Sequence, residues 1–389
     1  MGGIFVERSE IKMLFALLGS ALSGEKLSDE LLNEYSPDCL PKLIKVATKH
    51  DLAHMLAVGL KNNDLLDNPD AEKTIFKAIY RYELIKHAYE KLCTAFEKAE
   101  IPYIPLKGSV MRQYYREPWM RTSCDIDVLV KEEDLDRAVE VLTTEYGYTY
   151  DNKDSHDVSL YAENGMHLEL HYDLIEDEFA KNASEVLADV WDTARQRKGY
   201  KFLCEMPDEM FYFYHVSHMV KHFTVGGCGI RVFMDLWILD RIEGHSVDSR
   251  NSLLERGGLL KFVTSARELT HVWFEGGGYT AFAQTLEDFV LRGGVYGTRE
   301  NFVSVQQVKK GGKIKYTLAR IFLPYDTIKF HYPILQKYRF LTPVMQVRRW
   351  FKLIFCGHLG RVVTEINYNN HVANKDEKNT RYLLDSMGL

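Results

Sequence analysis

Two aspartates stand in a segment, Cys124–Val130, that otherwise has the composition of a buried strand. Residues i and i+2 of a strand lie on the same face, about 6.5–7 Å apart. Asp125 and Asp127 should therefore point one way, while Ile126 and Val128 point into the opposite layer. Two carboxylates this close repel each other unless a cation lies between them. Oxygen ligands favour Mg²⁺, which typically binds one or two carboxylates together with substrate phosphates.

A turn upstream of these aspartates has the composition of a phosphate-binding helix start. The residues are Leu106, Lys107, Gly108 and Ser109, and Asp125 follows Ser109 by sixteen positions. A Gly-Ser turn at a helix start presents backbone N–H groups and the positive end of the helix dipole, and both attract phosphate. The spacing therefore predicts a phosphate site next to a metal site.

A third segment, Met166–His171, alternates strictly between polar and apolar residues. Read as a strand, it places His167, Glu169 and His171 on one face. If this strand lies beside the first, Glu169 becomes a third carboxylate at the same metal. A zinc site made of the same three residues is the alternative. It is disfavoured because the two histidines would be more than about 13 Å apart along the strand.

These features together resemble the polymerase-β-type nucleotidyltransferase superfamily, and more closely an uncharacterised bacterial branch of it. The likeness is strong over residues 100–175 and weaker to about 240. The residues that carry it are Leu106, Lys107, Gly108, Arg121, Asp125, Ile126, Asp127, His171, His218 and His222. One departure concerns the turn, where the superfamily commonly has two small residues within or directly before it. Here Lys107 precedes Gly108 and Ser109.

The resemblance implies an enzyme that moves a nucleoside monophosphate from an NTP, by abundance ATP, to an acceptor and releases pyrophosphate. Asp125, Asp127 and Glu169 would be its catalytic residues and its ligands for Mg²⁺ or Mn²⁺. Lys107, Gly108, Ser109 and Arg121 would bind the nucleotide, with Ser109 on the β and γ phosphates and the two basic side chains neutralising developing charge. The acceptor, a small molecule, a protein or an RNA, is not specified. An inactive nucleotide-binding module and a metal-dependent phosphohydrolase that uses the histidine-rich elements are the alternative functions.

A histidine-rich helix is predicted over residues 209–222. His215, His218 and His222 follow spacings of three and four, which place them on one helix face. Two interpretations stay open. The face is either packed and hydrogen-bonded in the interior, or it lines a substrate cleft in which His171, His218, Lys221 and His222 take part.

Two further pairs carry weaker signals. Arg231 and Asp235 are four residues apart, which predicts an ion pair along one helix, and the resemblance suggests that they support the site. The dipeptide His156-Asp157 is similar to the metal-binding motif of some phosphohydrolases. Beside a turn, a single dipeptide of this kind often has no such role, so we set it aside.

The pattern of elements predicts an α+β protein with a small mixed β-sheet flanked by helices. We expect a helical N-terminal region over residues 1–100, a nucleotidyltransferase α/β core over 101–175 and a helical C-terminal region over 176–389. The strands are predicted at 103–106, 124–130, 148–150, 158–162 and 167–174. The main C-terminal helices are predicted at 209–222, 232–242, 253–274 and 279–291, and residues 369–379 are expected to be disordered.

The composition of the whole chain is that of a globular protein. The 389 residues are 46% hydrophobic and carry 49 basic and 55 acidic side chains, a net charge of −6. No global field therefore recruits nucleic acid, and neither DNA nor a membrane is expected as a partner. The six cysteines are scattered, which fits a reducing cytoplasm. Near the C-terminus, basic residues including Arg348, Arg349 and Lys352 form either a polyanion-binding patch or a solvated face.

Overall fold

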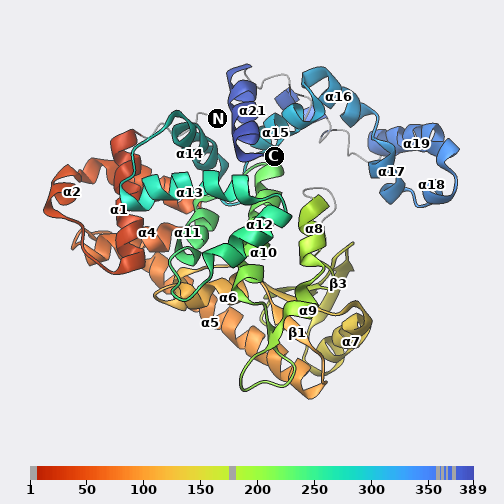
Figure 1. The fold of residues 1–389 in the computed structure, drawn as a ribbon, viewed down its shortest axis with the longest axis horizontal. Coiled ribbons are helices and arrows are strands. Elements are labelled where there is room, and N and C mark those ends of the chain that lie inside the picture. The colour runs from red at the N-terminus through yellow and green to blue at the C-terminus, as the bar shows by residue number, and fades with distance from the viewer. Residues whose placement is uncertain (1–6, 175–180, 356–359, 361–362, 365–366, 370–373) are drawn as a thin grey trace.

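The computed structural model describes the chain except for residues 1–6, 175–180, 356–359, 361–362, 365–366 and 370–373. The fold is α+β, as predicted: one small mixed sheet lies among many helices (Figure 1). The five strands are β1 (Tyr103–Pro105), β2 (Asp125–Val130), β3 (Thr149–Lys153), β4 (Asp157–Tyr161) and β5 (His167–His171). Their order in the sheet is β1-β2-β5-β4-β3, in which β2 and β5 are parallel and the other pairs are antiparallel.

The sheet has one apolar face and one mixed face. Ile126, Val128 and Leu168 pack on helices α5 (Pro69–Lys98) and α7 (Leu135–Glu145) in one hydrophobic core. Leu129 points the other way and joins the larger core. The strict alternation of β2 and β5 thus separates the core-forming residues from the carboxylates, as the sequence predicts.

The larger core joins helices from both ends of the chain. It includes residues of α1 (Arg8–Ser23), α3 (Leu40–Lys49) and α4 (Ala53–Asn62), together with residues of α10 (Asp208–Thr224), α11 (Ile230–Leu239) and α13 (Leu260–Glu275). The division of the chain at residues 100 and 175 remains a prediction, but this core is shared across it. Short helices α2 (Asp29–Glu34), α6 (Lys107–Met111), α8 (Lys181–Leu187) and α9 (Val190–Thr193) complete this part, with the hairpin β6 (Arg195–Gln196) and β7 (Cys204–Glu205).

The C-terminal region is helical, and two of its predictions are wrong. The helix predicted over 253–274 is two helices, α12 (Val247–Arg256) and α13, because the chain turns at Gly257 and Gly258. Gly258 has a left-handed φ of +72°, and a Cβ on Gly257 would lie 2.4 Å from the Phe213 ring. Of the segment 369–379, which was expected to be disordered, residues 374–379 are helical because α21 runs from Asn374 to Met387, and residues 370–373 lie outside the described part of the chain.

The remaining helices follow α13 in chain order. They are α14 (Ala281–Gly293), α15 (Arg299–Lys310), α16 (Lys313–Ile321), α17 (Tyr325–His331), α18 (Ile334–Lys337) and α19 (Thr342–Phe355). Within the described part of the chain, no helix combines the length and the apolar character needed to cross a membrane.

Candidate active site

The predicted neighbour relation between the two acidic strands is confirmed. Strands β2 and β5 pair in parallel, and Asp127 lies opposite Glu169 in the register, with Asp125 opposite His167. Side chains that face each other across neighbouring strands lie on the same side of the sheet. Three acidic side chains are therefore gathered on the mixed face, two from β2 and one from β5.

Lys107 and His171 directly contact two of these three carboxylates. The Nζ atom of Lys107 lies 2.7 Å from Oδ1 of Asp127 and 3.4 Å from Oε2 of Glu169. The Nε2 atom of His171 lies 3.2 Å from Asp127 Oδ1 and 3.5 Å from Glu169 Oε2. We call Lys107, Asp125, Asp127, Glu169 and His171 the acidic cluster. His171, predicted as a cleft residue, is thus in contact with the carboxylates.

The charges of the cluster stabilise one another. Burial alone would raise the pKa of Asp127, but Lys107 and His171 outweigh it and hold that pKa well below its usual range. The hydrogen bond with His171 lowers the pKa of Glu169. Burial opposes the charged forms of Lys107 and His171, yet the carboxylates raise the pKa of both. Both carboxylates are therefore ionised at neutral pH, and Lys107 is protonated.

Asp125 differs from its neighbour two residues on. Burial and the charge of Asp127 raise the pKa of its carboxyl group. Within the described part of the chain, the Asp125 carboxylate makes no hydrogen bond or ion pair. It is therefore the acidic group of this cluster that still lacks a cation.

The turn that carries Lys107 is strained and closely packed. Lys107 has a φ of +42°, a left-handed value that costs a non-glycine residue on the order of 1–2 kcal/mol. A Cβ on Gly108 would lie 3.2 Å from Cβ of Ser123. The Arg112 guanidinium donates to the Gly108 carbonyl at 2.7 Å and to Oγ of Ser123 at 2.9 Å. These contacts hold the turn against the start of β2 and aim the lysine at the carboxylates.

A cavity of about 350 Å³ opens over the cluster. This volume is within the range of small-molecule sites, which is roughly 300–1,000 Å³. Lys107, Gly108 and Arg121 line it together with the three acidic residues and with the histidine face of α10. The hairpin between β3 and β4 supplies one wall through Asp154, His156 and Asp157. Asp154 was not predicted from the sequence, and the His156-Asp157 dipeptide, which pointed to this wall, was set aside there.

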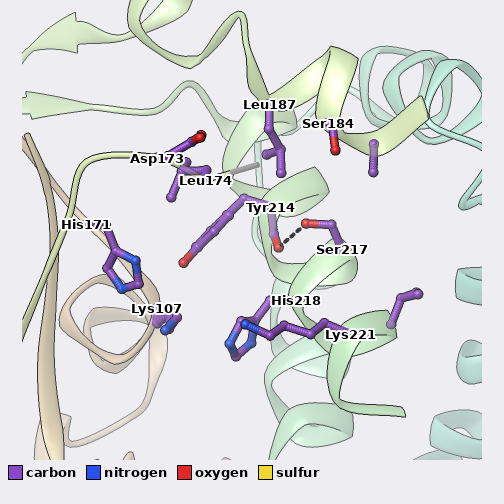
Figure 2. Close-up of a pocket in the computed structure, with 12 residues that line it drawn as sticks. Lys107, His171, Asp173, Leu174, Ser184, Leu187, Tyr214, Ser217, His218 and Lys221 are labelled. Carbon is purple, nitrogen blue, oxygen red and sulfur yellow. Dashed lines mark hydrogen bonds between the residues drawn. The ribbon is translucent and has the colours of Figure 1, made fainter. Parts of the chain in front are cut away.

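A smaller hollow of about 40 Å³ shares part of this wall (Figure 2). In the close-up, Lys107, His171, Tyr214, His218 and Lys221 point toward a common space between the sheet and α10. The His218 and His222 rings are hydrogen-bonded, with 3.1 Å between their Nε2 atoms. Two interpretations of the histidine helix were open, an interior face and a cleft wall. The structure places His218 and His222 at a cavity wall. His215 also lines the cavity, but its side chain is buried, with its Nε2 atom 3.4 Å from the Val232 carbonyl.

The two cavity histidines are uncharged at neutral pH. Burial and the nearby Lys107 lower the pKa of His222 to about 4 and that of His218 well below its ordinary value. A pair of neutral imidazoles can donate and accept hydrogen bonds without adding positive charge. This helix face can therefore recognise polar groups, while Lys107 supplies charge.

Arg121 lies at the cavity but its guanidinium is held by another residue. It forms a bidentate pair with Asp235 of α11, at 2.7–3.0 Å, and Tyr115 donates to the same carboxylate at 2.7 Å. Arg121 is 9% exposed and Asp235 is fully buried. The Arg121 guanidinium thus anchors the segment before β2, and the part of Arg121 in nucleotide binding stays a prediction.

The ion pair predicted between Arg231 and Asp235 is wrong. Arg231 reaches Asp51 at 3.2 Å and the Thr122 carbonyl at 2.9 Å, while Asp235 binds Arg121. Their helical spacing is compatible with an ion pair, but each side chain pairs with a residue from another segment, Arg231 with Asp51 and Asp235 with Arg121. Both arginines thereby hold α11 against the segment that leads into β2.

Ser109 faces away from the acidic cluster. It lines a separate cavity of about 470 Å³ with Gln113, Tyr114 and Phe211. Its backbone N–H is bonded to the Leu106 carbonyl at 3.0 Å. Helix α6 begins at Lys107, so Ser109 is turned by about 200° from the lysine. Lys107 and Gly108 are therefore the residues of the turn that line the cavity over the carboxylates.

Two overlapping groups of side chains have the spacing of a metal site. Ligand atoms of Asp127, Glu169 and His171 lie within 4.8 Å of one another, and so do those of His156, Asp157 and His171. His167, part of the alternative zinc site, instead contacts Oγ of Ser159 at 2.5 Å. Among the described residues, His167 belongs to neither group.

The fold and this acidic cluster agree with what the family comparison shows. Residues 38–275, more than half of the chain, match a protein family described as uncharacterised nucleotidyltransferase. The chain belongs to this family. No curated protein and no solved structure matches the sequence significantly. Nucleotidyl transfer is therefore supported as the general activity, and the matched segment contains the whole acidic cluster.

Proposed function

We propose that this protein is a metal-dependent nucleotidyltransferase that moves NMP from an NTP, by abundance ATP, to an acceptor and releases pyrophosphate. The observation that carries the proposal is the acidic cluster on the two central parallel strands, with Asp127 paired opposite Glu169 and Lys107 between them. Its resemblance to the polymerase-β-type superfamily is part of the same proposal.

The residues present fit a divalent cation such as Mg²⁺ or Mn²⁺. Asp125, Asp127 and Glu169 offer oxygen ligands, which both ions prefer. Asp125 has no partner among the described residues. Within the acidic cluster as the structure describes it, Lys107 is the one lysine, and it contacts the carboxylates of Asp127 and Glu169. When bound, the metal would stabilise the negative charge of the attacking and leaving oxygens.

The chain's own residues would bind and orient the nucleotide. Lys107 and the backbone of Gly108 line the cavity beside the carboxylates, so they would hold the phosphates. The Lys107 ammonium stays charged because the carboxylates raise its pKa. It would also stabilise the pyrophosphate as it leaves.

Glu169 would accept the proton of the acceptor. Its pKa is lowered, so it is ionised at neutral pH and can take a proton. It is about one-quarter exposed, which leaves it reachable from the cavity, whereas Asp127 is almost fully buried. The neutral pair of His218 and His222 would position the acceptor by hydrogen bonds.

The test is transfer from ATP labelled at the α-phosphate. With Mg²⁺ present, we expect pyrophosphate release that depends on an added acceptor and incorporation of the label into it; EDTA should abolish both. Because the acceptor is unknown, sugars, small amines, proteins and RNA ends are tested in parallel. Asp125→Asn should be inactive, whereas Asp136→Asn, the same change on an exposed face of α7, should be active.

Two results would overturn the proposal. Release of phosphate or NMP without an acceptor would indicate a phosphohydrolase, for which the group His156, Asp157 and His171 offers ligands. Nucleotide binding without turnover for any acceptor class would indicate a binding module.

A further inference from the structure

The positive charge of this acidic protein is concentrated near its C-terminus. Residues 309–355 carry eleven Lys and Arg side chains and one acidic side chain, Asp326, whereas the whole chain has 49 basic and 55 acidic residues. A local excess of this size attracts polyanions even though the net charge is negative.

The same segment exposes an apolar helix face. On α19, the side chains of Val344, Val347, Phe351, Ile354 and Phe355 are each more than half exposed. Their spacings of 3, 4, 3 and 1 place them within one arc of about 100° on the helix. The Phe351 and Phe355 rings lie stacked, with their centroids 6.1 Å apart.

Basic side chains border this arc, and the opposite face holds α19 in place. Arg348 and Lys352 are exposed, and their positions on the helix place them along one edge of the apolar arc. On the other face Met345 and Gln346 are buried, and Gln346 donates to the Leu323 carbonyl at 2.5 Å. The helix thus has one face fixed to the protein and one amphipathic face left to solvent.

A second apolar stripe lies on α16. Ile314, Leu318 and the following Phe322 are spaced by four residues and are each more than half exposed, and Phe340 is 76% exposed. A soluble monomer rarely exposes so many large apolar side chains in one segment unless they bind something.

Helices α17, α18 and α19 project from the body on the side away from α1 and α2 (Figure 1). They have a small hydrophobic core of their own, formed by Leu323, Ile328, Leu335 and Met345. We call residues 313–355 the C-terminal lobe. The lobe lies outside residues 38–275, which match the family. It is also not part of the cavities over the acidic cluster.

We propose that the C-terminal lobe binds the surface of an anionic lipid bilayer. An interfacial helix buries its apolar face at the boundary of headgroups and acyl chains, while flanking Lys and Arg contact anionic headgroups. The exposed face of α19 has both parts, and the charge of residues 309–355 supplies the attraction. An RNA would satisfy the charge but would leave Val347, Ile354 and Phe355 in water. This contact is peripheral and needs no spanning helix, and it is independent of the transfer reaction proposed above.

Vesicle co-sedimentation of the full chain tests the proposal. We expect binding to vesicles of phosphatidylcholine with phosphatidylglycerol, weak binding to phosphatidylcholine alone, and release by high salt. Arg348→Gln with Lys352→Gln should weaken binding to anionic vesicles roughly 25-fold. Phe351→Ser with Phe355→Ser should weaken it by about 100-fold.

Matched controls separate the lobe from the rest of the surface. Lys45→Gln with Lys86→Gln removes the same charge, and Phe76→Ser with Tyr80→Ser removes exposed aromatic rings of α5. Both controls should bind vesicles as the wild type does, and all variants should have the same melting temperature as the wild type. Three results would overturn the proposal. The first is equal binding to anionic and neutral vesicles, and the second is a loss of vesicle binding in the controls as large as that in the lobe variants. The third is a solution dimer or a single-stranded RNA complex that depends on Phe351 and Phe355, with no binding to vesicles.

Discussion

Two buried ionic clusters, one around Arg121 and one around Asp127, are centred six residues apart in this chain and behave differently. Around Arg121, one guanidinium meets one carboxylate, that of Asp235, in bidentate geometry, and Tyr115 completes the hydrogen bonds. Around Asp127, one lysine and one histidine contact two of the three carboxylates, and the third, Asp125, has no partner among the described residues. The first cluster is electrically balanced and the second is not. Charge balance, more than burial, thus distinguishes a pair that holds the fold from a group of residues that we propose binds a metal ion.

The largest effect should come from the unbalanced cluster. Asp127→Asn and Asp125→Asn should each lower the transfer rate by about 10³-fold or more, because each removes an anionic metal ligand. Label transfer from ATP measures this. Activity near that of the wild type in either variant would sink the metal assignment.

Thermal melts of the same two variants supply the control for folding. Without metal, Asp125→Asn should be at least as stable as the wild type, since the raised pKa of Asp125 reflects repulsion and burial. Asp127→Asn should be less stable, because it leaves Lys107 without its closest partner.

The balanced cluster should show the reverse pattern. Asp235→Asn leaves the buried Arg121 unpaired and should cost about 3–5 kcal/mol of unfolding free energy. Arg121→Met with Asp235→Leu removes both charges and should recover much of that loss. Urea unfolding measures both. A stable Asp235→Asn protein that has lost nucleotide binding would instead make Arg121 a ligand-binding residue.

A buried histidine that accepts a hydrogen bond from the Ile230 N–H at the start of α11 should make stability depend on pH. Burial lowers the pKa of His50, which precedes the Asp51 partner of Arg231, to about 4. The unfolded chain, with a pKa near 6.5, binds this proton more readily than the folded one. Stability should therefore fall as the pH drops from about 6.5 to 4, by roughly 3 kcal/mol in total. Urea unfolding at several pH values over this range measures the effect. His50→Gln should remove this part of the dependence of unfolding free energy on pH, and an unchanged dependence would contradict the role given to His50.

Glu169→Gln tests the proton acceptor of the unbalanced cluster. Nucleotide should still bind, while the transfer rate should fall by on the order of 10²-fold, the scale of a lost general base. Single-turnover transfer and a nucleotide titration separate the two steps. Glu140→Gln, on an exposed face of α7, is the matched control. An equal loss of binding and rate would make Glu169 a ligand-binding residue only.

The smallest effect should come from Ser109, which the sequence placed on the phosphates. Because it lines the cavity on the other side of α6, Ser109→Ala should change the KM for ATP by less than about threefold. Gly108→Ala, whose Cβ would press on Ser123, should raise that KM more. Steady-state kinetics of the two variants measure both changes in KM. A larger increase for Ser109→Ala than for Gly108→Ala would indicate that Ser109 binds the phosphates.

The amino-acid sequence by itself determined which side chains share a face of the sheet. The alternation in β2 and β5 sends Asp125, Asp127 and Glu169 to one side and Ile126 and Leu168 to the other, because the strand period is two wherever the chain is extended. The Leu106–Gly108 turn, Arg121, the Asp125–Asp127 segment and the later histidines were together enough to indicate a nucleotidyltransferase family.

Only the tertiary structure decided which partner each charged residue meets. Arg121 and Asp235 are 114 positions apart, and their contact depends on α11 packing against the segment before β2. His156 reaches the cavity because β4 pairs with β5 in one register, and Ser109 faces away from it because its position on α6 turns it away from Lys107. Local periodicity fixes the direction of a side chain within its own element, whereas ion pairs and cavity walls depend on the packing of elements far apart in the chain.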